Sequence, residues 1–123
     1  MTNSPFYSDL SVLYLEDEPL IAFDTTDFLQ ELGFSEVKSA YKLKSAEQAI
    51  SEKTFDLAIL DINVDNNQTS LLLGSQLAGE GIPVIFASGN SFDAERLRAE
   101  GFEFLDKPFS YEDLESAICS ALT

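Results

Sequence analysis

The stretch Leu57-Ala58-Ile59-Leu60-Asp61 decides the fold, because a continuous apolar run ends abruptly on an acid. A short apolar run without alternation is typical of a strand that is buried on both faces of a sheet. Similar segments lie at 11–15, 83–87 and 102–105, and each is followed by polar residues. A weaker, partly polar strand is expected at 34–40, where it suits the edge of the sheet.

Helical segments lie between these strands. Residues 19–32 begin at Pro19, which suits the first turn of a helix, and are followed by Gly33, which suits a helix C-cap. The regular alternation predicts an α/β fold, a doubly wound five-stranded parallel sheet in the flavodoxin-like order 2-1-3-4-5. The other helices are expected at 45–53, 70–78, 94–100 and 113–122.

Length and composition indicate one folded domain, 1–123, with residues 1–10 as a loose lead-in and no output domain after Leu122. Seven basic and 22 acidic residues give a net charge of −15, so we expect no binding to nucleic acid or to anionic membranes. No apolar run is long enough for a membrane helix and no signal peptide is recognisable, which predicts a cytoplasmic location.

Histidine is absent, and cysteine occurs once, at Cys119. Without histidine the chain has no Ser-His-Asp or Cys-His nucleophile and no His-ligated metal site. A single cysteine forms no internal disulfide and no Cys-x-x-Cys motif, and we place Cys119 in the core of the last helix.

Charged and polar residues follow the expected central strands directly. The carboxyl ends of parallel strands meet at one edge of a sheet, so these side chains should share one crevice. Carboxylates gathered there repel one another unless a cation lies among them, and their hard oxygen atoms suit Mg²⁺. With a hydroxyl and an ammonium nearby, the group suits phosphoryl chemistry without a nucleotide-binding glycine motif. The residues are Glu16, Asp17, Asp61, Ser88 and Lys107.

Four stretches, at 12–18, 57–63, 84–89 and 104–108, join a buried strand to the charged or polar residues that follow it. On these four motifs the chain resembles, over essentially its whole length, the receiver domain of two-component response regulators. The resemblance implies that Asp61 accepts a phosphoryl group from a phosphohistidine of a histidine kinase or histidine phosphotransfer protein, and that the domain is not a turnover enzyme. The matching stretches are Val12-Leu13-Tyr14-Leu15-Glu16-Asp17-Glu18, Leu57-Ala58-Ile59-Leu60-Asp61-Ile62-Asn63, Val84-Ile85-Phe86-Ala87-Ser88-Gly89 and Phe104-Leu105-Asp106-Lys107-Pro108.

The same resemblance assigns the metal ligands. Asp17, Asp61 and the backbone carbonyl of Asn63 would hold Mg²⁺, with Glu16 acting mainly through water. Side chains at the positions of Asn63 and Asn90 would flank the path of the hydrolytic water and so set the lifetime of the acyl phosphate.

A switch is implied next to the metal site. Ser88 and Lys107 would bind phosphoryl oxygens, and the inward movement of Ser88 would open space for the aromatic ring of Phe104 to turn toward the core. The Lys107–Pro108 peptide bond is typically cis in this family. The output would be a rearranged protein-interaction surface.

The chain departs from the family pattern in the loop 62–68, which lacks the usual Pro-Gly. The segment 86–89 resembles the Phe-Ala-Thr-Gly motif of a group of stand-alone receivers, with Ser88 in place of Thr.

Other interpretations of the acids remain open. They could be solubilising ends of buried strands, the start of a calcium loop at Asp61, or part of an aspartate-nucleophile phosphatase. The calcium loop lacks the required glycine at Asn66 and glutamate at Leu72, and the phosphatase lacks a second aspartate at Asn63. A receiver-fold interaction module that works without phosphorylation is a further alternative.

The first expected helix has an outward apolar side. Helical periodicity places Leu20 and Phe23 opposite the sheet, together with Asp24, Asp27 and Glu31. The two apolar residues would form a docking patch with an acidic rim for the phosphohistidine donor. Alternatively, Phe23 folds back over the last helix. The sheet side would carry Ile21, Ala22, Thr25, Phe28, Leu29 and Leu32.

Overall fold

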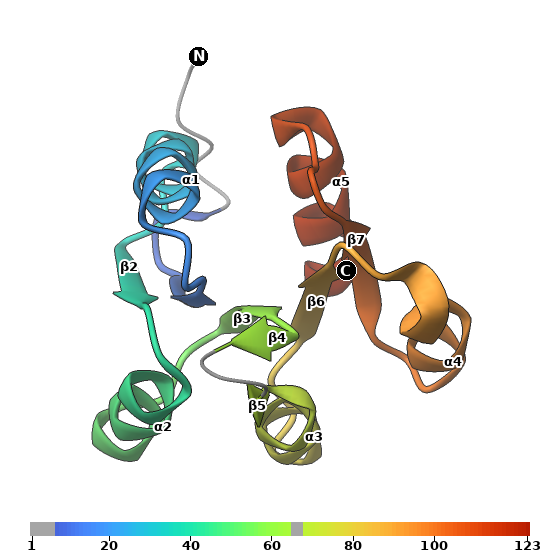
Figure 1. Cartoon of the computed structure of the whole chain (residues 1–123). Coiled ribbons are helices and arrows are strands. Elements are labelled where there is room, and N and C mark those ends of the chain that lie inside the picture. Colours follow the sequence, from blue (N-terminus) through green and yellow to red (C-terminus); the bar gives the residue numbers. More distant parts are fainter. Residues whose placement is uncertain (1–6, 65–67) are drawn as a thin grey trace.

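The computed structural model describes residues 7–64 and 68–123. Within these residues a parallel five-stranded sheet forms the centre (Figure 1). Its strands, in spatial order, are β2 (Glu36–Ala40), β1 (Ser11–Leu15), β3 (Leu57–Asp61), β6 (Val84–Ser88) and β7 (Glu103–Asp106). This is the expected order 2-1-3-4-5, since β6 and β7 are the fourth and fifth strands of this sheet in the chain.

Helices cover both faces of the sheet (Figure 1). One core cluster packs α1 and α5 against one face, and another packs α2, α3 and α4 against the opposite face. The elements are α1 (Pro19–Leu32), α2 (Leu43–Glu52), α3 (Leu71–Gly79), α4 (Ala94–Ala99), which follows the 3-10 turn η2 (Ser91–Asp93), and α5 (Tyr111–Leu122).

The ends of α1 lie where the sequence predicts them. Pro19 occupies the first turn, and Gly33 ends the helix in the left-handed region at φ 106°, a conformation that glycine adopts without a steric penalty. A stacked contact between Phe28 and Tyr111, with ring centroids 4.3 Å apart, joins α1 to α5.

Helix α3 lies unusually close to β6. A Cβ atom at Gly74 would lie 2.2 Å from Cζ of Phe86, so only a residue without a side chain fits there. This contact fixes the depth at which α3 sits on the sheet.

Several expectations need correction. Residues 7–10 are not loose, because Tyr7 is 3 % exposed and stacks on Phe34; residues 1–6 lie outside the described residues. Cys119 is exposed rather than in the core, on the side of α5 that faces Tyr7, whose Oη lies 3.6 Å from its Sγ. The segment expected as a loop after Asp61 contains an antiparallel pair, β4 (Asn63–Val64) and β5 (Gln68–Thr69).

Candidate functional site

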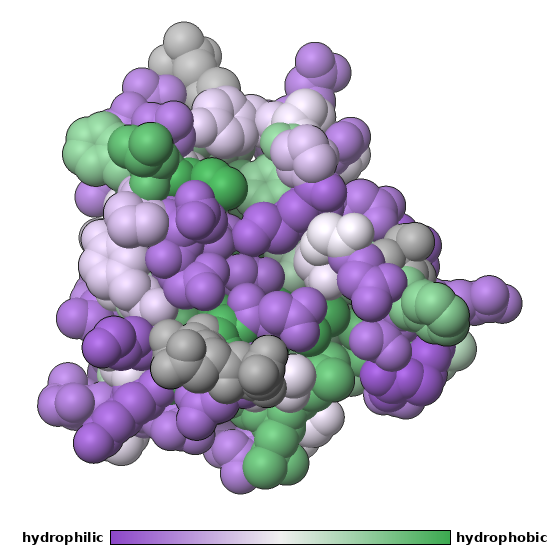
Figure 2. All heavy atoms as spheres, viewed as in Figure 1, coloured by the Kyte–Doolittle hydropathy of each residue, from purple (hydrophilic) through white to green (hydrophobic). Residues whose placement is uncertain are grey.

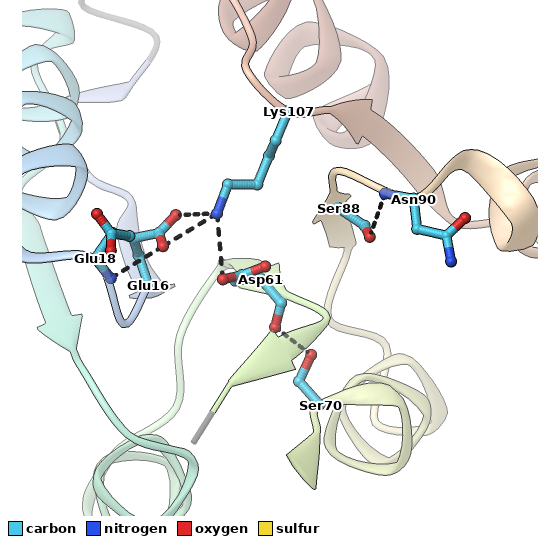
Figure 3. A network of polar contacts seen from close by, with 7 residues as sticks. All are labelled: Glu16, Glu18, Asp61, Ser70, Ser88, Asn90 and Lys107. Carbon is cyan, nitrogen blue, oxygen red and sulfur yellow. Dashed lines mark hydrogen bonds and ion pairs between the residues drawn. The ribbon is translucent and has the colours of Figure 1, made fainter. Parts of the chain in front are cut away.

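The carboxyl ends of the central strands bring Glu16, Asp61 and Lys107 together (Figure 3). Lys107 Nζ donates to Asp61 Oδ2 at 3.2 Å and to both carboxylate oxygens of Glu16, at 2.8 and 3.1 Å. The two acids are almost fully buried, with side chains 2 % and 7 % exposed, whereas that of Lys107 is 18 % exposed. One ammonium group therefore serves two buried carboxylates.

Backbone contacts fix the position of each group. The amide of Glu18 donates to Glu16 Oε2 at 3.2 Å, which holds the carboxylate at the end of β1. The amide of Lys107 donates to the carbonyl of Ser88 at 2.9 Å, which ties the ends of β7 and β6 together. The Lys107–Pro108 peptide bond is cis, as the resemblance implies.

Burial governs the protonation of Asp61. It raises the pKa of this carboxyl from 3.8 to about 7, since the lowering by Lys107 is offset by the charges of Glu16 and Asp17. For Lys107, burial lowers the pKa, but the hydrogen bond to Glu16 and the charges of both acids outweigh burial and leave the pKa raised. The single positive charge of Lys107 therefore does not balance the negative charges of Glu16, Asp17 and Asp61.

A divalent cation fits this deficit. Glu16, Asp17 and Asp61 each offer one oxygen atom, and these atoms all lie within 4.8 Å of one another. Asp17 is exposed while the other two acids are buried, so one side of the group is open to the water molecules that Mg²⁺ retains in proteins. The acidic group is the arrangement expected from the sequence.

Ser88 lies at the end of β6 and is 2 % exposed. Its Oγ accepts a hydrogen bond from the amide of Asn90 at 3.0 Å (Figure 3). Asn90 Oδ1 accepts one from the amide of Phe92 at 3.0 Å. The first bond uses a lone pair of the hydroxyl and leaves its hydrogen available for another acceptor. The second bond turns the side-chain oxygen of Asn90 toward the start of η2 rather than toward Asp61.

Phe104 has a different starting position from the one expected. Phe104 is 5 % exposed and already lies in the core. The expected movement of its ring from the surface toward the core is therefore not needed from this conformation. Arg98 holds the ring there, because its guanidinium carbon lies 5.5 Å from the ring centroid and its Nη2 donates to the Phe104 carbonyl at 3.5 Å. Burial by α4 and the cation–π contact are the physical reason for the difference.

The outward side of α1 carries two exposed apolar residues among exposed acids, as expected. Leu20 and Phe23 are 80 % and 71 % exposed, so Phe23 does not fold back over α5, and apolar surface lies over α1 in Figure 2. Ile21, expected on the sheet side, is 38 % exposed. It lies at the margin of the buried stripe and lines a groove of about 350 Å³ between α1 and the start of α5.

Sequence reasoning missed Ser70, which is fully buried at the start of α3. Its Oγ donates to the backbone carbonyl of Asp61 at 2.8 Å (Figure 3). No local pattern identifies a serine whose hydroxyl reaches nine residues back along the chain. Asn63 lies at the rim, in β4, with an exposed side chain.

The described residues thus form an α/β domain with a parallel sheet that carries a buried aspartate, two further acids and a lysine at the carboxyl ends of its strands. The sequence model described as "Response regulator receiver domain" matches residues 12–119, and the chain belongs to this family. Such domains are regulatory phospho-acceptors rather than turnover enzymes. Among the described residues, no helix has both the length and the apolar character needed to cross a membrane.

Curated relatives are longer than this chain. It is 28 % identical over 112 residues to the transcriptional regulatory protein LytR of Staphylococcus aureus (strain N315), covering 89 % of this chain and 46 % of that protein. It is 31 % identical over 113 residues to the transcriptional regulatory protein CrdR of Helicobacter pylori, covering 87 % of this chain and 52 % of that protein. The chain thus spans about half the length of these relatives.

Solved structures have the same fold. SdrG from Sphingomonas melonis Fr1 is 30 % identical with a TM-score of 0.75, covering 94 % of this chain and 98 % of that chain. The response regulator TrrA from Thermotoga maritima, in complex with Mg²⁺-BeF, is 23 % identical with a TM-score of 0.79, covering 92 % of this chain and 99 % of that chain.

Proposed function

We propose that Asp61 accepts a phosphoryl group from a phosphohistidine of a histidine kinase or a histidine phosphotransfer protein, with Mg²⁺ as cofactor. The observation that carries this proposal is the buried Asp61 carboxylate, 3.2 Å from Lys107 Nζ and grouped with Glu16 and Asp17. None of the 123 residues is a histidine, so the phosphohistidine donor of this proposal lies outside them.

The transfer is a displacement at phosphorus. An oxygen of the ionised Asp61 carboxylate forms a bond to phosphorus while the bond from phosphorus to the imidazole nitrogen breaks, and the electron pair of that bond stays on the imidazole. The product is an acyl phosphate on Asp61. Because the pKa of Asp61 is about 7, the nucleophilic form becomes more abundant as positive charge at the site increases.

Asp17, Asp61 and the backbone carbonyl of Asn63 would hold the cation, with Glu16 acting mainly through water. When bound, Mg²⁺ would neutralise part of the negative charge that the acids and the incoming phosphoryl group share. Lys107 would then donate to a phosphoryl oxygen, and Ser88 would donate the hydrogen that its bond to Asn90 leaves available.

The response to phosphorylation would travel through Ser88 and Phe104. Inward movement of Ser88 breaks its bond to the Asn90 amide and changes the space around the Phe104 ring and the loop that leads to α4. Such a change shifts the population of an existing two-state element. The readout in this proposal is a protein partner that distinguishes the two states.

Docking would use the exposed side of α1. A helical phosphohistidine donor must bring its imidazole to Asp61, and α1 leads directly away from the Glu16–Asp17 edge of the site. Leu20 and Phe23 would anchor the donor on α1. A cytoplasmic location and spontaneous loss of the phosphoryl group also belong to this proposal.

Intact-mass measurement after incubation with a small phosphodonor and Mg²⁺ tests the acceptor. Wild type should gain one phosphoryl group, and Asp61→Asn should gain none. Asp106→Asn is the matched control, since Asp106 is an exposed aspartate at the end of β7, two strands away from β3 in the sheet, and it should be labelled like wild type. Undiminished labelling of Asp61→Asn would overturn the assignment, and an unlabelled wild type would favour the phosphorylation-independent module.

A further inference from the structure

Ser70 makes a hydrogen bond that its position at the helix end does not explain. It is the N-cap residue of α3, and serine at an N-cap usually accepts a hydrogen bond from an amide of the first helical turn. Ser110 does so at the start of α5, where its Oγ accepts from the Asp113 amide at 3.0 Å. The Ser70 side chain makes no such capping bond and instead donates to the Asp61 carbonyl at 2.8 Å.

The backbone of Ser70 contacts the peptide group that follows Asp61. Its amide donates to the carbonyl of Ile62 at 2.9 Å. Side chain and backbone of one residue thus hold the carbonyl groups of Asp61 and Ile62 in succession. These peptide groups connect the acceptor carboxylate to Asn63, whose carbonyl is a metal ligand in the proposed function.

Helix α3 packs closely against β6. The close approach of Gly74 to Phe86 fixes its depth, and the amide of Gly74 donates to the carbonyl of Ser70 at 2.9 Å. Ser70 is fully buried, so its hydroxyl has no solvent competing for it. The residue that binds the Asp61 and Ile62 carbonyls is therefore buried and belongs to a helix packed closely on the sheet.

We propose that Ser70 is a positioning residue, which sets the geometry between the Asp61 carboxylate and the Asn63 carbonyl and so tunes the affinity of the site for Mg²⁺. This proposal rests on the proposed function. Residues 62–68 contain no proline, so the chain after Asp61 lacks the backbone restriction that proline would give. The two hydrogen bonds from the buried Ser70 restrict the backbone of Asp61 and Ile62 instead.

The test is a calorimetric titration of the unphosphorylated chain with Mg²⁺ alone. Ser70→Ala should bind Mg²⁺ roughly tenfold more weakly than wild type, as is common when a group that orients a metal ligand is removed. Ser70→Thr keeps the hydroxyl and should bind more tightly than Ser70→Ala. Ser11→Ala is the matched control, because Ser11 is also a buried serine with a side-chain hydrogen bond, to Asp56, but lies at the opposite end of the sheet.

A second readout needs no metal. In the metal-free state, the amide signals of Ile62 and Asn63 should shift and exchange faster with solvent in Ser70→Ala, and should stay unchanged in Ser11→Ala. If Ser70→Ala binds Mg²⁺ like wild type, the positioning role is overturned while the proposed function stands. If wild type itself does not bind Mg²⁺, the proposed function fails and this inference fails with it.

Discussion

Lys107 and Glu16 lie 91 residues apart in the chain and form a bidentate ion pair, with Lys107 Nζ 2.8 Å from Oε1 and 3.1 Å from Oε2. The distance to Asp61 is longer, 3.2 Å. In the unphosphorylated chain the ammonium therefore contacts the acid of β1 more closely than it contacts the acceptor. Phosphoryl oxygens on Asp61 would compete with Glu16 for this ammonium.

The raised pKa of Asp61 predicts that the folded state of the metal-free chain is more stable at low pH, where Asp61 is protonated. A folded-state pKa of about 7 against 3.8 means that the folded state binds this proton more tightly than the unfolded state does. The resulting stability is complete below about pH 4 and is lost as the pH rises through about 7. At pH 8, Asp61→Asn should be more stable than wild type by on the order of 2 kcal/mol.

Urea denaturation at pH 5 and pH 8, in EDTA and in excess Mg²⁺, measures this effect. Mg²⁺ should reduce the difference at pH 8, because the bound cation stabilises the ionised carboxylate. Asp106→Asn is again the control, since Asp106 is exposed. A free energy of unfolding that is unchanged in Asp61→Asn at pH 8 would contradict the buried, charge-deficient environment.

Asp17 should matter for metal binding more than for stability, because its carboxylate is exposed. Asp17→Ala should weaken Mg²⁺ binding by on the order of tenfold or more, since it removes a direct oxygen ligand. Calorimetric titration measures the affinity, and chelation should stop labelling of wild type. An unchanged Mg²⁺ affinity would mean that the ion binds elsewhere.

Ser88→Ala should separate labelling from response. The variant keeps Asp61 and Lys107, so a small phosphodonor should still label it. It lacks the hydroxyl hydrogen that would bind a phosphoryl oxygen, so the amide spectrum of the β6–α4 segment should change less than in wild type after addition of beryllofluoride and Mg²⁺. An activated spectrum identical to that of wild type would refute the coupling.

Asn63 and Asn90 should set how long the acyl phosphate lasts. Asn63→Leu and Asn90→Leu should each slow the loss of phosphate, because a bulky apolar group disfavours an ordered water molecule near the bond that breaks. The side-chain oxygen of Asn90 is held by the Phe92 amide, so Asn63 should have the larger effect. Equal decay rates in wild type and both variants, followed by intact mass, would show that neither position controls hydrolysis.

The patch on α1 should affect only a protein donor. Leu20→Ala combined with Phe23→Ala should slow transfer from a phosphohistidine protein roughly tenfold or more, as the loss of exposed anchor residues does in other interfaces. Labelling by a small donor should stay normal. Leu72→Ala is a matched control, because Leu72 on α3 is 71 % exposed, like Phe23, but on the opposite face. Equal slowing with both donors would rule out docking at α1.

The sheet could be predicted because its strands are marked locally. The bounds of β1, β3 and α1 follow from apolar runs and end residues and are confirmed without change. The hairpin of β4 and β5 was not predictable, because its strands are two residues long and neither has an apolar pattern.

The site was predictable in composition but less so in arrangement. Strand ends identify Glu16, Asp61 and Lys107, yet nothing local shows that Lys107 contacts Glu16 at both oxygens. The buried position of Phe104 depends on Arg98 and α4, which the sequence does not place against it. Contacts between segments distant in the chain account for these differences.

The two core clusters lie on opposite faces of the sheet, and this separates the proposed functions in space. The donor patch belongs to α1, on the face shared with α5, whereas the ring of Phe104 is buried on the face of α4. A partner seated on α1 leaves the α4 side uncovered. Under the proposed function, a donor on α1 and a target on the α4 side would bind at the same time, and Asp61 would be phosphorylated again without release of the target.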